Sequence, residues 1–429
     1  MMAYASSLPD GAAADTPNTP DTPRVFAWTV FALTFGLLIS DYMSRQVLNA
    51  VFPLLKQEWQ LSDARLGLLS GIVALMVGLL TFPLSLLADR WGRVKSLVLM
   101  AGLWSVATLG CALAQDYSQM FVARFFVGVG EAAYGSVGIA VVLSVFPRHM
   151  RSTLTGAFMA GGMFGSVLGM ALGGAIAAHV GWRWAFAAMA LFGLALAAAY
   201  PMIVRPSRMA DAGRGRAAGA RPPLASLFAG RALRAAYIGS GLQLFAGGAC
   251  IVWMPSYLNR YYGLGADRAG IGAAVLVLAS GAGMVLCGML SDRLSRVQDN
   301  RKVSLAACYC MGAAVLLGAG FLLPPGAAQL VLVGCGMFVA AGASGPAGAM
   351  VANLTPGAVH GTAFATLTLA NNLLGLAPGP FVTGALADRV GLDRAFCVIP
   401  LASLAAACVF AYARRHYDGD CAVIGGSKG

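Results

Sequence analysis

Four ionisable residues, Asp41, Arg45, Arg124 and Glu131, lie within stretches that are otherwise almost wholly apolar. Arg124 and Glu131 are seven residues apart, so a helix places them on one face, two turns from each other. Asp41 and Arg45 are four residues apart and share a helix face in the same way. Carboxylates exchange protons, and the planar guanidinium group suits a carboxylate or phosphate ligand. Proton exchange and anion binding are therefore the chemistry open to these residues.

The composition shows what surrounds these charges. Of the 429 residues, 59% are hydrophobic and only 11% are charged, whereas soluble domains carry roughly 25% charged residues. An apolar stretch of about 20 residues is long enough to cross a bilayer. We therefore predict an all-α membrane protein. Its twelve apolar stretches run over about 25–52, 65–88, 96–115, 118–146, 153–180, 184–204, 233–258, 268–290, 303–323, 327–352, 361–386 and 394–413.

The basic residues predict the orientation of this protein. An even number of crossings places both termini on one side, which then carries 20 Lys and Arg residues against seven on the opposite side. Positively charged loops are typical of the cytoplasmic face. We expect a multi-pass protein of a bacterial inner membrane, with both termini cytoplasmic. This topology explains the net charge of +12 without a nucleic-acid partner, and the sequence shows no nucleic-acid-binding motif.

Internal similarity divides the chain into two halves. The segment "GAIAAHVGWRWAF" (174–186) matches "GALADRVGLDRAF" (384–396), and "SLLADRWGR" (85–93) matches "GMLSDRLSR" (288–296). Two parallel repeats of six helices with a substrate site between them are a known transporter architecture. The predicted organisation is a disordered cytoplasmic tail (1–24), a six-helix bundle (25–204), a basic cytoplasmic linker (205–232), a second six-helix bundle (233–413) and a cytoplasmic tail (414–429).

These motifs resemble those of the major facilitator superfamily. "SLLADRWGRVK" is similar to its signature G-x-x-x-D-R-x-G-R-[KR]-[KR], with Ser85 and Val94 as departures. "ARFFVGVGEAAY", "FPRHMRS" and "GWRWAF" resemble two of its branches, the bacterial Spinster-like proteins and the anion:cation symporters of organic acids. The resemblance covers essentially the whole chain after residue 24. It implies the two-bundle fold and a central cavity that opens to each side in turn.

The resemblance also implies roles for the charged residues. Glu131 and Asp41 would be the proton-coupling groups, and Arg45 and Arg124 would bind an anionic substrate together with Tyr42 and Tyr134. Both branches carry an adjacent Asp-Arg pair in the first helix, where this chain has Ser44-Arg45 and places its carboxylate one turn earlier, at Asp41. The alternative is a static set of ion pairs that joins the first and fourth helices. The four charges sum to zero, so pairing would remove much of the roughly 10 kcal/mol that they cost unpaired in a membrane.

Other polar residues are candidates for substrate binding or gating. Gln243, Trp253, Asn371 and Asn372 are expected to line the cavity from the second half, although amides in apolar helices also bond neighbouring helices. Asp89, Arg90 and Arg93, with Asp292 and Arg293 in the second repeat, match family residues that latch the cytoplasmic side in the outward-open state. Gly161, Gly165, Gly169 and Gly173 form a ladder for close helix packing, which we assign to the segment "NNLLGLAPGP" (371–380) as partner. Pro378 and Pro380 should bend that segment.

Taken together, these features predict a secondary active transporter, driven by the proton gradient, for a small organic anion such as a carboxylate or sugar acid. A Spinster-like exporter of lipids or lysolipids is the alternative within transport, and a non-transporting membrane sensor is the alternative outside it. The sequence shows no nucleotide-binding loop and no nucleophile or metal cluster. We expect no enzyme activity, no metal and no cofactor, and a monomer in the lipid bilayer.

Overall fold

The computed structural model describes residues 24–147, 150–204, 227–228, 230–295, 300–356 and 359–426. Most of the predicted N-terminal tail and linker, and the last three residues, lie outside these ranges. The described chain is helical and shows no strand. Its elements are α1 (Arg24–Trp59), α2 (Asp63–Trp91), α3 (Arg93–Leu113), α4 (Tyr117–Glu131), α5 (Tyr134–Val145), α6 (Arg151–His179), α7 (Trp182–Ile203), α8 (Arg231–Tyr262), α9 (Ala266–Leu294), α10 (Asn300–Leu322), α11 (Ala327–Ala341), α12 (Ser344–Asn353), α13 (His360–Asn371), the π-helix η5 (Asn372–Leu376), α14 (Pro378–Val390), α15 (Leu392–Val398) and α16 (Pro400–Gly426).

The predicted twelve crossings are present. Within the described residues, eleven helical segments are long and apolar enough to span a membrane. The twelfth crossing is α13–η5–α14, which a π-helix interrupts just before Pro378. Three other crossings also contain a break, between α4 and α5, α11 and α12, and α15 and α16. The prolines thus disturb the predicted segment, and the disturbance takes the form of a π-helix, a feature that is frequent at functional sites.

The outer surface of the helices is suited to lipid. Large apolar side chains are exposed along their lengths, such as Leu113 (70%), Val275 (60%) and Val331 (63%). In water these residues would lose the favourable free energy of apolar burial. Polar residues mark helix ends instead: the Ser62 side chain accepts from the Arg65 amide at the start of α2, and Asp116 does the same for Gln119 at the start of α4.

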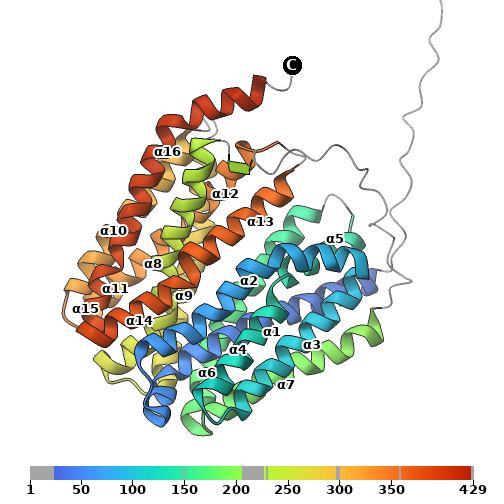
Figure 1. Cartoon of the computed structure of the whole chain (residues 1–429), viewed down its shortest axis with the longest axis vertical. Coiled ribbons are helices and arrows are strands. Elements are labelled where there is room, and N and C mark those ends of the chain that lie inside the picture. Colours follow the sequence, from blue (N-terminus) through green and yellow to red (C-terminus); the bar gives the residue numbers. More distant parts are fainter. Residues whose placement is uncertain are drawn as a thin grey trace, which may run out of the picture.

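The two predicted halves form two helix bundles, α1–α7 and α8–α16 (Figure 1). We call the end of the molecule at which α1 begins and α16 ends the termini end, and the opposite end the distal end. In Figure 1, α2 and α14 run side by side near the distal end, and the ribbons of α2 and α13 diverge toward the termini end. The repeats correspond closely, since α2 and α9 both have 29 residues and start 203 positions apart.

The distal contact between the bundles is symmetric and depends on glycine. Gly67 of α2 lies against the Pro380 carbonyl of α14, and its repeat equivalent Gly270 lies against the Met170 carbonyl of α6. A Cβ atom at either glycine would collide with that carbonyl, so the two bundles approach backbone to backbone. The same relation holds for Gly384, which lies against the carbonyl of Asp63. The distal end is therefore closed by helix pairs α2–α14 and α6–α9.

The glycine ladder of α6 packs differently from our prediction. Gly165 lies against Ile39 and Tyr42, and Gly169 lies against Met43. Its partner is therefore α1 in the same bundle, and the predicted partner segment 371–380 packs on α2 instead. The prediction was wrong because a small-residue stripe shows only that a backbone comes close. It does not identify that backbone.

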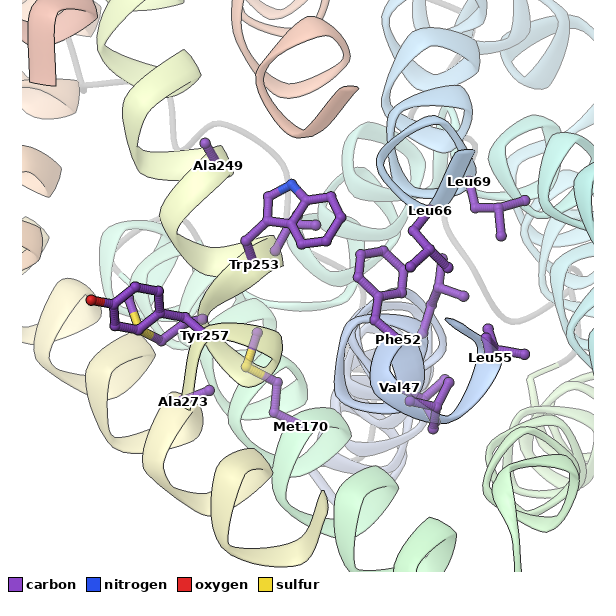
Figure 2. Packing of buried hydrophobic residues seen from close by; sticks show 14 of the residues in the cluster. Val47, Phe52, Leu55, Leu66, Leu69, Met170, Ala249, Trp253, Tyr257 and Ala273 are labelled. Carbon is purple, nitrogen blue, oxygen red and sulfur yellow. The ribbon is translucent and has the colours of Figure 1, made fainter. Parts of the chain in front are cut away.

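A buried apolar core runs through the contact between the bundles (Figure 2). Trp253 of α8 points toward Phe52 of α1, and their ring centroids are 5.2 Å apart. Met170 of α6 lies near Ala273 of α9 on the other side of this contact. Because Phe52 and Trp253 are both wholly buried, this part of the contact excludes water.

Candidate functional site

Two carboxylates converge on one guanidinium group in the first bundle. Arg45 Nε is 2.5 Å from Glu131 Oε2 and 3.4 Å from Asp41 Oδ1. Both carboxylates are almost fully buried, whereas the Arg45 side chain keeps 21% of its surface exposed. We call Asp41, Arg45 and Glu131 the ion cluster. The helix positions them directly, since Asp41 and Arg45 are one turn apart on α1 and Glu131 is the last residue of α4.

Neighbouring groups fix the geometry of the ion cluster. The Ser44 hydroxyl donates to Glu131 Oε1 at 3.1 Å, so the serine that precedes Arg45 contacts the glutamate. The Tyr42 ring lies 5.5 Å from Arg45 Cζ, a distance typical of a cation–π contact. Tyr42 itself packs on Gly162 and Gly165 of α6. The ion cluster thus contains three of the residues predicted for protons and substrate, and it contacts a fourth, Tyr42, as well as Ser44, where the sequence departs from the family pattern.

Arg124 is placed differently from Arg45. It is 1% exposed, and its guanidinium group donates to the carbonyl oxygens of Ser44 (2.9 Å) and Leu69 (3.4 Å). No hydrogen bond or ion pair joins it to a carboxylate of the described residues. Since Ser44 belongs to α1 and Leu69 to α2, Arg124 connects three helices. In this conformation its contacts are those of a helix clamp, and its predicted contact with substrate stays a prediction.

A conservative substitution separates these two roles of Arg124. Arg124→Lys keeps the charge but replaces the planar fork with a single ammonium group, which cannot reach both carbonyls in the same way. We expect a loss of stability of about 1–3 kcal/mol from the unsatisfied buried carbonyl, with little change in KM for substrate. Thermal unfolding in detergent and transport kinetics measure the two quantities. A large rise in KM at unchanged stability would instead assign Arg124 to the substrate.

Tyr134 lies in the core of the first bundle. Its side chain is wholly buried, its hydroxyl donates to the Thr34 carbonyl at 2.6 Å, and its ring packs edge-on against Trp104. These contacts hold α5 against α1 and α3. The helix breaks after Glu131 and restarts at Tyr134, and the predicted contact of Tyr134 with substrate stays a prediction.

The candidates in the second bundle lie in three different places. Trp253 is buried in the distal closure, where its indole nitrogen donates to the Pro380 carbonyl at 2.9 Å, and its predicted contact with substrate stays a prediction. Asn371 and Asn372 lie at the start of the π-helix, and Asn372 packs on Gly78 of α2. Gln243 is 4% exposed and lines a small cavity within the second bundle.

The ion pairs that the predicted gating residues form in the described part of the chain lie within one bundle. Arg93 and Asp89 form an exposed ion pair one turn apart, at 3.2 Å. Asp292 pairs with Lys302 at 3.1 Å. No ion pair of Arg90 or Arg293 is present among the described residues. The predicted latch would join the bundles in the opposite, outward-open state, and it stays a prediction.

A second ionic group, which the sequence did not reveal, joins the bundles at the distal end. The Asp63 carboxylate accepts two hydrogen bonds from Arg260 of the second bundle, at 2.6 and 2.7 Å. Lys56 of the first bundle donates to it at 2.6 Å. The Asp388 carboxylate of α14 also joins the bundles, because it accepts hydrogen bonds from the backbone amides of Asp63 and Ala64, at 2.7 and 2.9 Å. We call Lys56, Asp63, Arg260 and Asp388 the distal latch.

The comparisons with known proteins identify the family. The sequence model of the Major Facilitator Superfamily matches residues 34–380. The chain belongs to this superfamily. The fold agrees, because a bacterial homologue of the human lysosomal transporter Spinster superimposes with a TM-score of 0.82 at 20% sequence identity, covering 93% of this chain and 99% of that one. That structure is described as inward-facing and occupied, and an unoccupied form gives a TM-score of 0.81.

Several curated relatives are named as transporters of organic acids. A probable L-galactonate transporter of Escherichia coli K12 is 25% identical over 73% of this chain and 74% of its own length. The gallate transporter of Pseudomonas putida is 26% identical over 89% of this chain and 90% of its own length. Protein spinster homolog 3 of Danio rerio is 26% identical over 59% of this chain and 52% of its own. Both predicted branches are therefore represented among the relatives.

Proposed function

We propose that this superfamily member is a proton-coupled symporter that moves a small organic carboxylate across a bacterial inner membrane. The observation that carries the proposal is the convergence of two buried carboxylates on the partly exposed Arg45. Two carboxylates and one guanidinium group in direct contact have a net charge of −1, so the site can bind one further positive charge. That charge can be a proton.

The geometry couples proton and substrate through competition for Arg45. Two neighbouring carboxylates disfavour being ionised together, and the arginine between them offsets this repulsion. When the carboxylate of a substrate binds Arg45, the two protein carboxylates lose part of their counter-charge. One of them then binds a proton, which restores the balance of charge. Release of the substrate returns Arg45 to Glu131 and favours release of the proton.

The state of the two ends fits one step of this cycle. The distal latch and the glycine contacts close the distal end, while the predicted cytoplasmic latch makes no ion pair between the bundles within the described residues. With both termini in the cytoplasm, as the basic loops indicate, the distal end faces the periplasm. The described conformation then corresponds to the inward-facing state.

The test is transport by the purified full-length protein in proteoliposomes. The substrates are a hexonate, a hydroxybenzoate and a lysophospholipid, each offered with and without an imposed proton gradient. We expect uptake of a carboxylate that increases when the side of substrate addition is made acidic. If carboxylate uptake were the same with and without the proton gradient, proton coupling would be refuted. Transport of the lysophospholipid alone would favour the Spinster-like alternative.

A further inference from the structure

The second bundle contains a cavity that the ion cluster does not use. Its volume is about 160 Å³, and it lies between α8, α9, α10, α11, α12 and η5. Most of its walls are apolar, with a few polar groups that include Gln243 and Ser280. We call it the C-bundle pocket. The apolar side chains that line it include Leu244, Ile251, Met284, Leu317, Met337 and Leu376.

One polar group of the C-bundle pocket lacks a partner. Gln243 is 4% exposed, and its amide nitrogen lies 3.4 Å from the Ala340 carbonyl. Its Oε1 atom accepts no hydrogen bond from the described residues. A buried acceptor without a donor costs about 1–3 kcal/mol. A ligand that supplies one hydroxyl group would remove this penalty.

The pocket lies at the same depth in the molecule as Arg45. Lys56 near the end of α1 and Arg260 near the end of α8 both bind Asp63, so α1 and α8 run in the same direction. Phe52 and Trp253 are in contact across the two helices. Seven residues before Phe52 is Arg45, and seven before Trp253 is Ala246. The residues of α8 that line the pocket run from Ser240 to Ile251 and are centred on that level.

A short segment of α6 lies between the ion cluster and the C-bundle pocket. Tyr42, whose ring lies beside Arg45, packs on Gly162. The next residue, Met163, lies against Gly281 of α9. Gly281 follows Ser280, which lines the pocket. The ion cluster and the C-bundle pocket therefore lie on facing bundles at one depth, and residues 162–163 of α6 contact a neighbour of each.

We propose that the C-bundle pocket holds the ring of a hydroxylated aromatic monocarboxylate whose carboxylate binds Arg45. This inference rests on the proposed function and narrows its substrate class. An apolar cavity of about 150 Å³ is large enough to hold benzene, and the thioethers of Met284 and Met337 make favourable contacts with aromatic rings. Gln243 Oε1 accepts the ring hydroxyl. A sugar acid would bury several hydroxyl groups against walls that offer few partners, at a cost for each unpaired group.

Filling the pocket tests the assignment. A Cβ at Gly247, which lines the pocket, meets no atom within 4 Å, and the same is true of Gly102 on α3. Gly247→Leu therefore starts from an open Cβ position and extends its side chain into the pocket, and Gly102→Leu is the matched control for an added leucine elsewhere. In proteoliposomes we expect 4-hydroxybenzoate to be preferred to a hexonate. Gly247→Leu should raise its KM at least about tenfold, the effect of 1.4 kcal/mol, and Gly102→Leu should leave the KM unchanged.

A second variant tests the hydroxyl contact. Gln243→Met keeps the size of the side chain and removes the acceptor, so the preference for 4-hydroxybenzoate over benzoate should fall about tenfold. A hexonate preferred to 4-hydroxybenzoate, or equal kinetics for Gly247→Leu and Gly102→Leu, would overturn the ring assignment and leave carboxylate symport intact. Failure to transport any carboxylate would overturn the proposed function and this inference together.

Discussion

Replacing Glu131 by glutamine is expected to abolish proton-driven accumulation of substrate while retaining exchange of substrate across the membrane. Glutamine keeps the size of the side chain and an oxygen that can accept from Arg45 Nε, which lies 2.5 Å from Glu131 Oε2. It cannot gain or lose a proton. The variant therefore mimics the protonated carboxylate permanently, and the cycle loses the step that links substrate release to proton release.

The size of this effect follows from the driving force. One unit of pH gradient supplies about 1.4 kcal/mol per proton, which supports roughly tenfold accumulation for a one-to-one symporter. We expect the Glu131→Gln variant to reach a ratio of about one, while counterflow of labelled substrate continues. Glu58→Gln is the matched control, because Glu58 pairs with Arg183 within the first bundle at an exposed position. Accumulation by Glu131→Gln with the pH dependence of the unmodified protein would refute the assignment.

The sequence was sufficient to predict the twelve crossings and the ion cluster. Apolar length predicts a crossing because every backbone polar group in lipid must be bonded within a helix. A buried charge predicts a partner because an unpaired one costs several kcal/mol. The partners are Asp41 and Arg45, which lie one turn apart on α1, and Glu131, which lies on α4. The pairing of Asp41 with Arg45 follows from their spacing on one helix. Glu131 could be added to the ion cluster because so few other charges lie within the apolar stretches.

The partners of single polar residues could not be predicted. Arg124 and Tyr134 are satisfied by backbone carbonyls of Ser44, Leu69 and Thr34, and the sequence does not show which carbonyls a fold leaves accessible. The distal latch depends on residues near the ends of α1, α8 and α14 and at the start of α2, which only the packing of two bundles brings together. Each looked like an ordinary charge near a helix end.

The repeat comparison shows why the distal latch matters. Each bundle supplies the same glycine contacts, but the position equivalent to Asp63 in the second repeat is Ala266, and the position equivalent to Asp388 in the first is Ala178. The α2–α14 contact therefore carries both aspartates of the latch, which bind Lys56 of α1, Arg260 of α8 and the start of α2, whereas the α6–α9 contact has alanine at both positions. An asymmetric latch on a symmetric contact can be removed without disturbing the helix packing that forms the closure.

Replacing Asp63 by asparagine is accordingly expected to open the distal end. The variant keeps the size of the side chain and removes the charge that binds Arg260 and Lys56, leaving both cations partly buried without a counter-ion. Breaking one partner of a buried ion pair costs about 3–5 kcal/mol, and even 1.4 kcal/mol shifts a two-state equilibrium tenfold. The closed state should therefore lose most of its population.

Distances between spin labels at Gln57 and Arg268, which are exposed at the distal ends of the two bundles, report the population directly in a variant without cysteine. We expect Asp63→Asn to convert a short distance into a longer one and to lower the transport rate, because a carrier that rarely closes on one side cannot complete its cycle. Asp393→Asn is the control, because it makes the same chemical change at a residue that binds only within its own bundle in the described structure. The Asp393 carboxylate accepts a hydrogen bond from Tyr261 of the second bundle. If both variants kept the short distance, the glycine contacts alone would hold the distal end closed, and the charges would serve only to orient the loops.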